Sequence, residues 1–166
     1  MAVADLIGAA VGVILLVLVA YILVGSVLST AQIVTNAQKS STFLEENQLK
    51  TNIAISPSPP PSSNGSLLTF NVTNTGSVVI SDFTHMDILS NNGTAAYSYY
   101  TYIPVQSFDG APGTWTITGF DQTYPIHSGA LDPSETMYCT AAYAGNAPVW
   151  FQITTANAVS ASSYLT

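Results

Sequence analysis

The sequence has very few basic residues. It contains no arginine and only two lysines, Lys39 and Lys50, against nine Asp and Glu residues, so its formal net charge is −7. Proteins that bind nucleic acid need Lys and Arg side chains to neutralise phosphates. The composition therefore excludes nucleic acid as a partner. A surface solvated mainly by hydroxyl and amide groups suits a protein that packs against copies of itself or carries sugars.

Cysteine is equally scarce, because Cys139 is the only one in the chain. A single cysteine forms no intrachain disulfide. It lies within residues 135–143, which have the composition of a strand, so we expect a buried and inert thiol. A reactive or intermolecular thiol is the alternative.

The short motifs that accompany catalysis are missing from the sequence. It has no Gly-rich phosphate loop, no CxxC, no HExxH and no GxSxG. We therefore expect no enzymatic activity, no cofactor and no small-molecule substrate. His85 and His127 are far apart in the sequence, and they would bind a metal with Asp82, Asp87 or Asp121 only if folding brought them together. Histidines in solvent or on the face of a strand are the simpler interpretation.

Several carboxylates fall in predicted loops, where oxygen ligands can bind Ca²⁺ with the help of backbone carbonyls. Asx turns, in which the side chain accepts a bond from its own loop, explain them more simply. The residues concerned are Asp109, Asp121 and Asp132.

Against these absences stands one long apolar run, residues 6–28, which contains no charged residue. Twenty-three such residues are enough to cross a bilayer core of about 30 Å as a helix. A secretory signal peptide is the competing interpretation. The run is longer than a usual signal core, no basic residue precedes it, and no small-x-small cleavage site is evident. A membrane helix is therefore favoured.

Small residues recur at helical spacing in and beside this run. Ala4, Gly8 and Gly12 are four residues apart, which places them on one stripe, and Gly25 lies at the other end. Such a stripe lets a neighbouring backbone approach closely, although glycine is also common in ordinary membrane helices. Because glycine in a helix interior costs about 1 kcal/mol relative to alanine, we favour a helix-packing surface. Asp5 is the one charge nearby, at a helix start, where the dipole favours an anion.

The chain past the apolar run is predicted to stay helical as far as Lys50. An intermittent apolar stripe continues along it, and Glu46 and Lys50 form a favourable pair four residues apart. We therefore divide the chain into a long N-terminal helix, 1–50, with its membrane or filament-core segment at 6–28, and a β-domain, 51–166. A proline-rich loop at 56–63 follows the first short strand, since proline neither continues a helix nor donates to a central ladder.

Short strand patterns separated by Gly, Asn and Pro fill the rest of the chain. Such punctuation indicates an antiparallel sandwich, here called Ig-like. One strand carries four tyrosines, which suit packing or subunit contacts. The predicted strands are 52–56, 67–72, 83–89, 95–105, 114–118, 135–143, 149–154 and 159–165.

Three Asn-x-Ser/Thr sequons occur in the predicted β-domain. They begin at Asn64, Asn71 and Asn92. Asn64 and Asn92 lie in or beside turns, where an acceptor must be exposed, whereas Asn71 lies in a strand. Use of any of them as an N-glycosylation site would place the β-domain outside the cell.

Taken together, these segments resemble archaeal type IV pilin-like proteins of the archaellum. The resemblance rests on the apolar N-terminal helix and on three short motifs. They are LTFNVTNTGS at 68–77, LDPSE at 131–135 and ITTANAVS at 153–160. The family contains the filament subunits, or archaellins, and related accessory proteins that anchor the motor to the surface layer.

The resemblance implies a structural role in one of two forms. In the first, the chain is a filament subunit for motility or adhesion. It would be inserted in the membrane before assembly, would then polymerise with copies of itself into an extracellular filament, and Asp5 would pair with a neighbour's amine. In the second, it is a membrane-anchored accessory, or stator, protein whose β-domain binds the surface layer. Family prepilins carry a short basic leader, and none precedes Leu6. Either the numbering starts at the mature residue, or this member is never cleaved, and an uncleaved form would favour the accessory branch.

Overall fold

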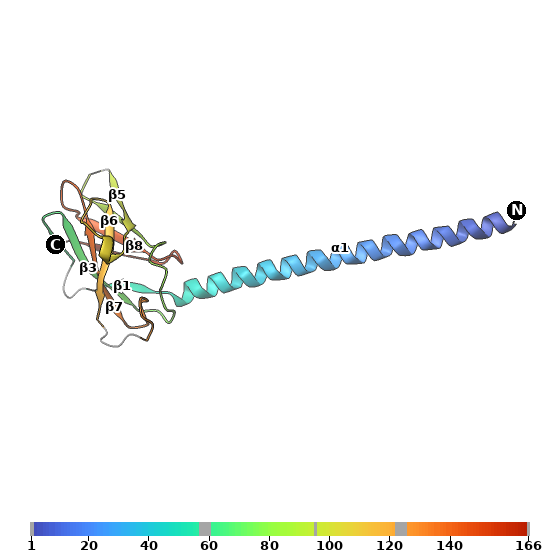
Figure 1. The fold of residues 1–166 in the computed structure, drawn as a ribbon, viewed down its shortest axis with the longest axis horizontal. Helices are drawn as coiled ribbons and strands as arrows, with labels where there is room; N and C mark the ends of the chain where they lie inside the picture. Colours follow the sequence, from blue (N-terminus) through green and yellow to red (C-terminus); the bar gives the residue numbers. More distant parts are fainter. Residues whose placement is uncertain (1, 57–60, 95, 122–125, 166) are drawn as a thin grey trace. The chain divides into compact units, whose positions relative to one another are not determined.

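The structure is a computed structural model that describes residues 2–56, 61–94, 96–121 and 126–165 (Figure 1). The chain divides into two compact units, Met1–Leu44 and Glu45–Thr166. The first is helical throughout its described length, and the second holds the last six residues of the helix, 45–50, and all the described strands.

Helix α1 runs from Ala2 to Lys50. Its apolar segment 6–28 is about 35 Å long at 1.5 Å per residue, which matches the hydrocarbon core of a bilayer. Within the part of the chain that the structure describes, this is the one helix that is long and apolar enough to cross a membrane. Its leucine, valine and isoleucine side chains are exposed on every side of the segment. A helix that is apolar all round suits apolar surroundings rather than the surface of a globular protein.

The β-domain is built from short strands that form one continuous, folded sheet (Figure 1). The strand order is β1-β3-β7-β6-β5-β4-β8-β9, and β2 pairs with β3 beside β1. The strands are β1 (Ile53–Ile55), β2 (Ser62–Asn64), β3 (Leu67–Asn74), β4 (Asp87–Asn91), β5 (Tyr97–Tyr102), β6 (Thr114–Phe120), β7 (Thr136–Ala142), β8 (Trp150–Thr154) and β9 (Ser160–Tyr164). A short 3₁₀ helix, Val105–Ser107, follows β5.

The pairings confirm the predicted α+β class, a long helix followed by a mostly antiparallel β-domain. One pairing departs from it, because β5 and β6 are parallel through Thr101–Thr114 and Tyr102–Trp115. This pairing joins the β3-β7-β6 side of the domain to the β5-β4-β8-β9 side. The first and last strands, β1 and β9, also lie against each other, so the sheet nearly closes on itself and few strand edges are left open.

The core lies between the two sides of this sheet, and among the described residues none of its members comes from α1. Alternate residues of the strands point inward, as a half-buried strand requires. The ring centroids of Phe70 and Phe151 are 4.6 Å apart across it. The core residues are Ile53, Leu68, Phe70, Val72, Ile80, Phe83, Met86, Ile88, Tyr100, Trp115, Ile117, Leu131, Met137, Cys139, Ala141, Tyr143, Phe151 and Ile153.

Two sequence predictions need correction in this domain, one for a strand and one for the proline-rich loop. The strand predicted at 83–89 begins only at Asp87, because Phe83 and Met86 are buried from a turn rather than from a strand. Strand β2 was not predicted, and it takes residues 62 and 63 out of the predicted proline-rich loop 56–63. Three of the four prolines of that loop lie outside the described residues, and Pro61 is buried.

Candidate functional site

The predicted packing residues lie on an open part of α1. Ala4 and Asp5 are exposed, and a side chain built on Gly8, Gly12 or Gly25 would meet no atom within 4 Å. Nothing in the described part of the helical unit therefore explains the small size of these residues. A role for them in packing against other helices stays a prediction, as does the pairing of Asp5 with an amine.

The end of α1 is held by the β-domain in what we call the helix junction, residues 47–52 and 74–77. The Lys50 carbonyl, which the helix leaves without a partner, accepts a bond from the Ser77 amide at 2.9 Å. The Asn52 carbonyl accepts bonds from the amides of Thr75 at 2.9 Å and Gly76 at 3.0 Å. The chain is therefore fixed where it leaves the helix and enters β1.

Gly76 makes this close approach possible. A Cβ at this position would lie 2.4 Å from the Lys50 carbonyl oxygen and 2.5 Å from the Asn52 nitrogen, closer than non-bonded atoms pack. Both of these atoms belong to the backbone, so neither can rotate away. The turn at 74–76 is predictable from its Asn-Thr-Gly sequence, but the contact with the helix end is not.

The buried side chain of Asn74 fixes the same turn through hydrogen bonds. It is fully buried, and its side-chain nitrogen donates to the carbonyls of Val78 at 2.8 Å and Leu131 at 3.0 Å. Its side-chain oxygen accepts a bond from the Gly76 amide at 3.0 Å. Buried polar groups that are fully paired in this way make a turn rigid.

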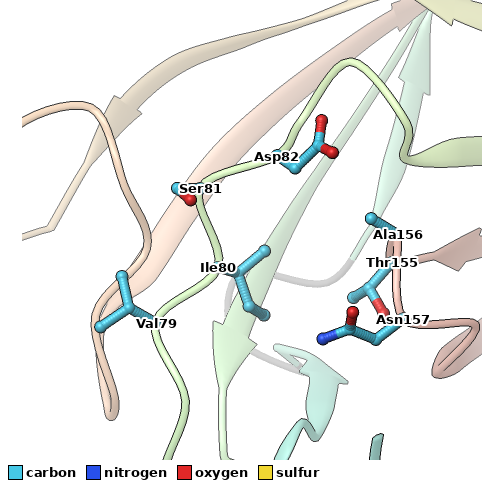
Figure 2. Close-up of a pocket in the computed structure, with 7 residues that line it drawn as sticks. All are labelled: Val79, Ile80, Ser81, Asp82, Thr155, Ala156 and Asn157. Atoms are coloured by element: carbon cyan, nitrogen blue, oxygen red, sulfur yellow. The ribbon is translucent and has the colours of Figure 1, made fainter. Parts of the chain in front are cut away.

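A second contact to the junction comes from the turn between β8 and β9. Thr51 is buried, and its hydroxyl donates to the Asn47 carbonyl at 2.7 Å and accepts from the side-chain nitrogen of Asn157 at 2.9 Å. Beside this contact lies a small pocket of about 140 Å³ (Figure 2). It is lined by residues 79–82 on one side and 155–157 on the other, without a pair of groups suited to nucleophilic catalysis. The pocket belongs to the packing around the junction.

The predicted ion pair between Glu46 and Lys50 is present in the last turn of α1. The hydrogen bond and charge of Lys50 lower the pKa of the Glu46 carboxyl. Both side chains are about half exposed, so the pair contributes little to stability.

Each histidine pairs with its own aspartate rather than with the other histidine. His85 Nδ1 lies 2.8 Å from the Asp82 carboxylate, and His127 Nδ1 lies 2.6 Å from Asp132. In both cases the hydrogen bond lowers the pKa of the aspartate. Asp87 is exposed on β4. Among the described residues, no group of three or more His, Cys, Asp and Glu is placed to hold a metal ion.

The three loop carboxylates accept hydrogen bonds from the protein. Asp109 forms the expected Asx turn, because it accepts the Ala111 amide at 2.9 Å. Asp121 accepts the Thr136 amide at 3.0 Å. Asp132 accepts the His127 amide at 3.0 Å as well as its ring nitrogen. These bonds give each carboxylate a role in a loop.

A buried carboxylate, Glu135, was not singled out from the sequence as a site of its own. It is 0% exposed, and its Oε2 accepts the Asp132 amide at 2.8 Å. Its Oε1 has no partner among the described residues. The residue before it, Ser134, has a φ of 68°, an uncommon conformation for a residue other than glycine. The Pro-Ser-Glu motif thus builds the turn that receives Asn74, since the Ser134 amide donates to the Asn74 carbonyl.

Two further sequence predictions concern Cys139 and the tyrosines of β5. Cys139 is buried, as expected, and burial raises the pKa of its thiol. Of the tyrosines on β5, Tyr100 is buried and bonded to Ser90, whereas Tyr97 and Tyr99 are exposed. The two interpretations of the tyrosines as packing and as surface residues therefore apply to different members.

The three sequons differ in their surroundings. Asn64 is exposed at the end of β2, and Asn92 is part of the turn between β4 and β5. Asn71 is half-buried inside β3, and the hydroxyl of its sequon residue Thr73 is bonded to Thr136 at 2.9 Å. Asn92 is half-buried like Asn71, but it lies in a turn rather than inside a strand. Use of any of the three as a glycosylation site stays a prediction.

Comparison with known proteins gives only distant likenesses. No family model matches the chain, and no curated protein matches it. The structure is similar to the archaellum periplasmic stator protein FlaG from Sulfolobus acidocaldarius, with a TM-score of 0.49 and 16% identity over 68% of this chain and 97% of that one. It is also similar to the stator complex of FlaF and FlaG from the same organism, with a TM-score of 0.46 and 15% identity over 68% and 87%. Both solved structures contain archaellum periplasmic stator proteins.

Proposed function

We propose that this chain is a membrane-anchored accessory protein of an archaellum, whose β-domain lies outside the cell and binds another component of the cell surface. The sequence resemblance supports an archaellum protein, and the structure supports a division of the chain into an anchor and a binding domain. One part is a helix suited to lipid, and the other is a domain with a complete core.

The observation that carries the proposal is the composition of that core. All of its residues come from 53–153, and none comes from α1. The β-domain therefore buries its apolar face without help from the helix, as a tethered binding module must. The apolar segment 6–28, exposed on every side, then needs an apolar environment of its own, and a bilayer supplies it.

The helix junction suits the same role. A protein that holds a surface component against a membrane transmits force between its anchor and its binding domain. The bonds at Lys50 and Asn52 and the close contact at Gly76 join the helix end to the domain through backbone atoms. These bonds fix the C-terminal end of the helix within the unit that begins at Glu45.

A filament subunit is the second candidate, and the open stripe at Gly8 and Gly12 favours it. Its β-domain would form the outer wall of a polymer, and the stripe would pack against sister helices. The two candidates predict different locations. A subunit dominates sheared surface filaments, whereas an anchored protein stays in the membrane fraction at low copy number.

We would test this with the double variant Gly8→Leu and Gly12→Leu, expressed in the native cells beside the volume-conserving control Leu16→Met. An anchored protein should keep its membrane level and its accessibility to protease outside the cell in both variants. Normal recovery of wild-type protein in the membrane and not in filaments supports the anchor. Abundant wild-type protein in filaments, lost only in the glycine variant, would show that the chain is a subunit.

A further inference from the structure

An aromatic row crosses the outer face of the β5-β4-β8-β9 side of the domain. Tyr97 lies opposite Asn91, Asn91 opposite Trp150, and Trp150 opposite Tyr164, so the four share one face of four neighbouring strands. Tyr97 is 57% and Tyr164 73% exposed. With Val149 these residues line a shallow depression of about 290 Å³, which we call the aromatic shelf.

The turn that carries the sequon at Asn92 borders this shelf. The Val149 amide donates to the Asn91 carbonyl at 2.8 Å, and a Cβ at Gly93 would lie 3.9 Å from Val149 Cγ2. The Asn91 side chain fixes the turn, because its nitrogen donates to the Thr94 carbonyl at 2.7 Å and its oxygen accepts the Gly93 amide at 2.7 Å. A group attached to Asn92 therefore starts next to the shelf.

The sequon residues Asn92 and Thr94 are hydrogen-bonded to each other, and Asn92 is half-buried. The Asn92 side-chain oxygen accepts bonds from the Thr94 hydroxyl at 2.7 Å and the Thr94 amide at 3.3 Å. These bonds fix the side chain by its oxygen and orient the nitrogen, which is the atom that takes a sugar. Asn64 is exposed at the end of β2, but its aromatic neighbour Tyr143 is only 5% exposed.

The chemistry of the shelf fits a neutral sugar chain. None of its lining residues is charged, and the domain from residue 51 onward has no Lys or Arg to bind an anion. Tyrosine and tryptophan combine an apolar ring, which packs against the C–H face of a pyranose, with a polar group at its edge. A second copy of the domain would bring like charges together, since the carboxylates between residues 82 and 135 are balanced by no Lys or Arg.

We propose that Asn92 carries a neutral glycan whose first sugars lie on the aromatic shelf. The proposal rests on the proposed function, because it requires the β-domain to lie outside the cell. The sugar would come from an oligosaccharide linked to a lipid through a phosphate. The bond from Asn92 Nδ2 to the sugar C1 forms as the C1–O bond to the phosphate breaks, and Nδ2 gives up a proton. A tether this short raises the local concentration of the glycan at the shelf to the millimolar range.

The test uses the full chain purified from the membranes of its native cells, with Asn92→Gln and the matched control Asn64→Gln. Mass spectrometry of peptides should show added hexose mass on the peptide containing Asn92, lost in Asn92→Gln and kept in Asn64→Gln. Trp150 and the buried Trp115 are the only tryptophans, so acrylamide quenching of their emission reports on the shelf. Quenching should rise in Asn92→Gln and stay unchanged in Asn64→Gln.

A second pair of variants separates the shelf from any change in folding. In Trp150→Ala, the remaining emission of Trp115 should be equally quenched with and without Asn92→Gln, and its wavelength should show that the core is intact. Tyr164→Ala, at an exposed position, should raise quenching in the glycosylated protein. Equal quenching of the wild type and Asn92→Gln, despite a glycan on Asn92, would overturn the shelf as its binding surface.

Two further outcomes distinguish this proposal from the proposed function. An unmodified Asn92 in a β-domain that protease reaches from outside the cell overturns the glycan and leaves the anchor intact. A β-domain that protease reaches only from the cytoplasmic side overturns both.

Discussion

The apolar segment of α1 and the β-domain place the same kinds of side chain in opposite positions. In segment 6–28, leucine, valine and isoleucine are exposed on every side, whereas in the β-domain Leu68, Ile88 and Ile153 are fully buried. Apolar surface is stable wherever water is excluded from it. The domain excludes water with its own strands, and the helix needs an external apolar phase. Stability is therefore a property of the chain in one region and of its surroundings in the other.

The backbone hydrogen bonds also differ between the helix and the β-domain. An α-helix satisfies its amides and carbonyls within one segment, so it can stand alone in lipid. Strands need neighbours, and here the sheet nearly closes from β1 to β9. At the helix junction, hydrogen bonding within the helix gives way to hydrogen bonding with the domain. The Lys50 carbonyl, which has no partner within the helix, accepts a bond from the Ser77 amide.

The largest effect should come from placing charge in the apolar segment. Two carboxylates, in the variant Val13→Asp and Val17→Asp, should cost about 5–7 kcal/mol of membrane insertion, at about 2.5–3.5 kcal/mol for each Asp near the helix centre. Alkaline extraction of membranes should release this variant and retain the wild type. Retention of the variant would show that lipid is not what surrounds the helix.

The next largest effect should come from removing a large apolar side chain from the core of the β-domain. Phe151 is fully buried against Phe70, so Phe151→Ala should lower the free energy of unfolding by about 3–5 kcal/mol. Urea unfolding of the full chain in detergent, followed by far-ultraviolet circular dichroism of the β-domain, measures this. The exposed control Tyr99→Ala should change stability by less than about 0.5 kcal/mol, and both proteins should stay in the membrane fraction. Loss of Phe151→Ala from the membrane would show that the anchor depends on the domain.

Much of this comparison was predictable from the sequence, because it depends on local patterns. The uncharged run at 6–28 and the alternation in β3 follow from residue type and period alone. Strand β2 was missed because its Ser-Ser-Asn sequence has no apolar residue, and only pairing with β3 makes it a strand. The parallel pairing of β5 with β6 likewise depends on tertiary arrangement.

The candidate sites were less predictable, since each depends on residues far apart in the chain. The motif at Asn74 and Gly76 signalled a turn, but the approach of Lys50 to Gly76 appears only in three dimensions. The aromatic row needs the register of four strands, so Trp150 and Tyr164 did not stand out in the sequence.

A smaller loss of stability is expected from a substitution in the helix junction than from one in the core. In Gly76→Ala the new Cβ would lie within 2.5 Å of two backbone atoms of the junction, and overpacking of this kind costs about 1–3 kcal/mol. Hydrogen exchange should become faster at the Ser77 amide, which donates to Lys50. Gly119→Ala is the matched control, because its Cβ would meet Tyr138 at an ordinary 3.7 Å. Unchanged exchange at Ser77 would mean that the turn adapts and does not hold the helix end.

The smallest effect concerns two aspartates with similar partners and different burial. The hydrogen bond to His127 lowers the pKa of Asp132 from its ordinary value of 3.8, and that to His85 lowers the pKa of Asp82. Their side chains are 2% and 51% exposed, respectively. A carboxylate whose pKa is lower in the folded state stabilises the fold above its ordinary pKa, and this contribution is lost as the pH falls through the lowered value.

Acid should therefore act mainly through Asp132, because solvent screens the exposed pair of Asp82 and His85. Between about pH 5 and about pH 2.5, the urea midpoint of the wild type should fall. The fall should be smaller in Asp132→Asn, whose stability at the higher pH is already reduced, and unchanged in Asp82→Asn. Equal acid sensitivity of the two variants would indicate that burial does not distinguish these pairs, and that the turn before β7 draws its stability from Glu135 and Asn74 instead.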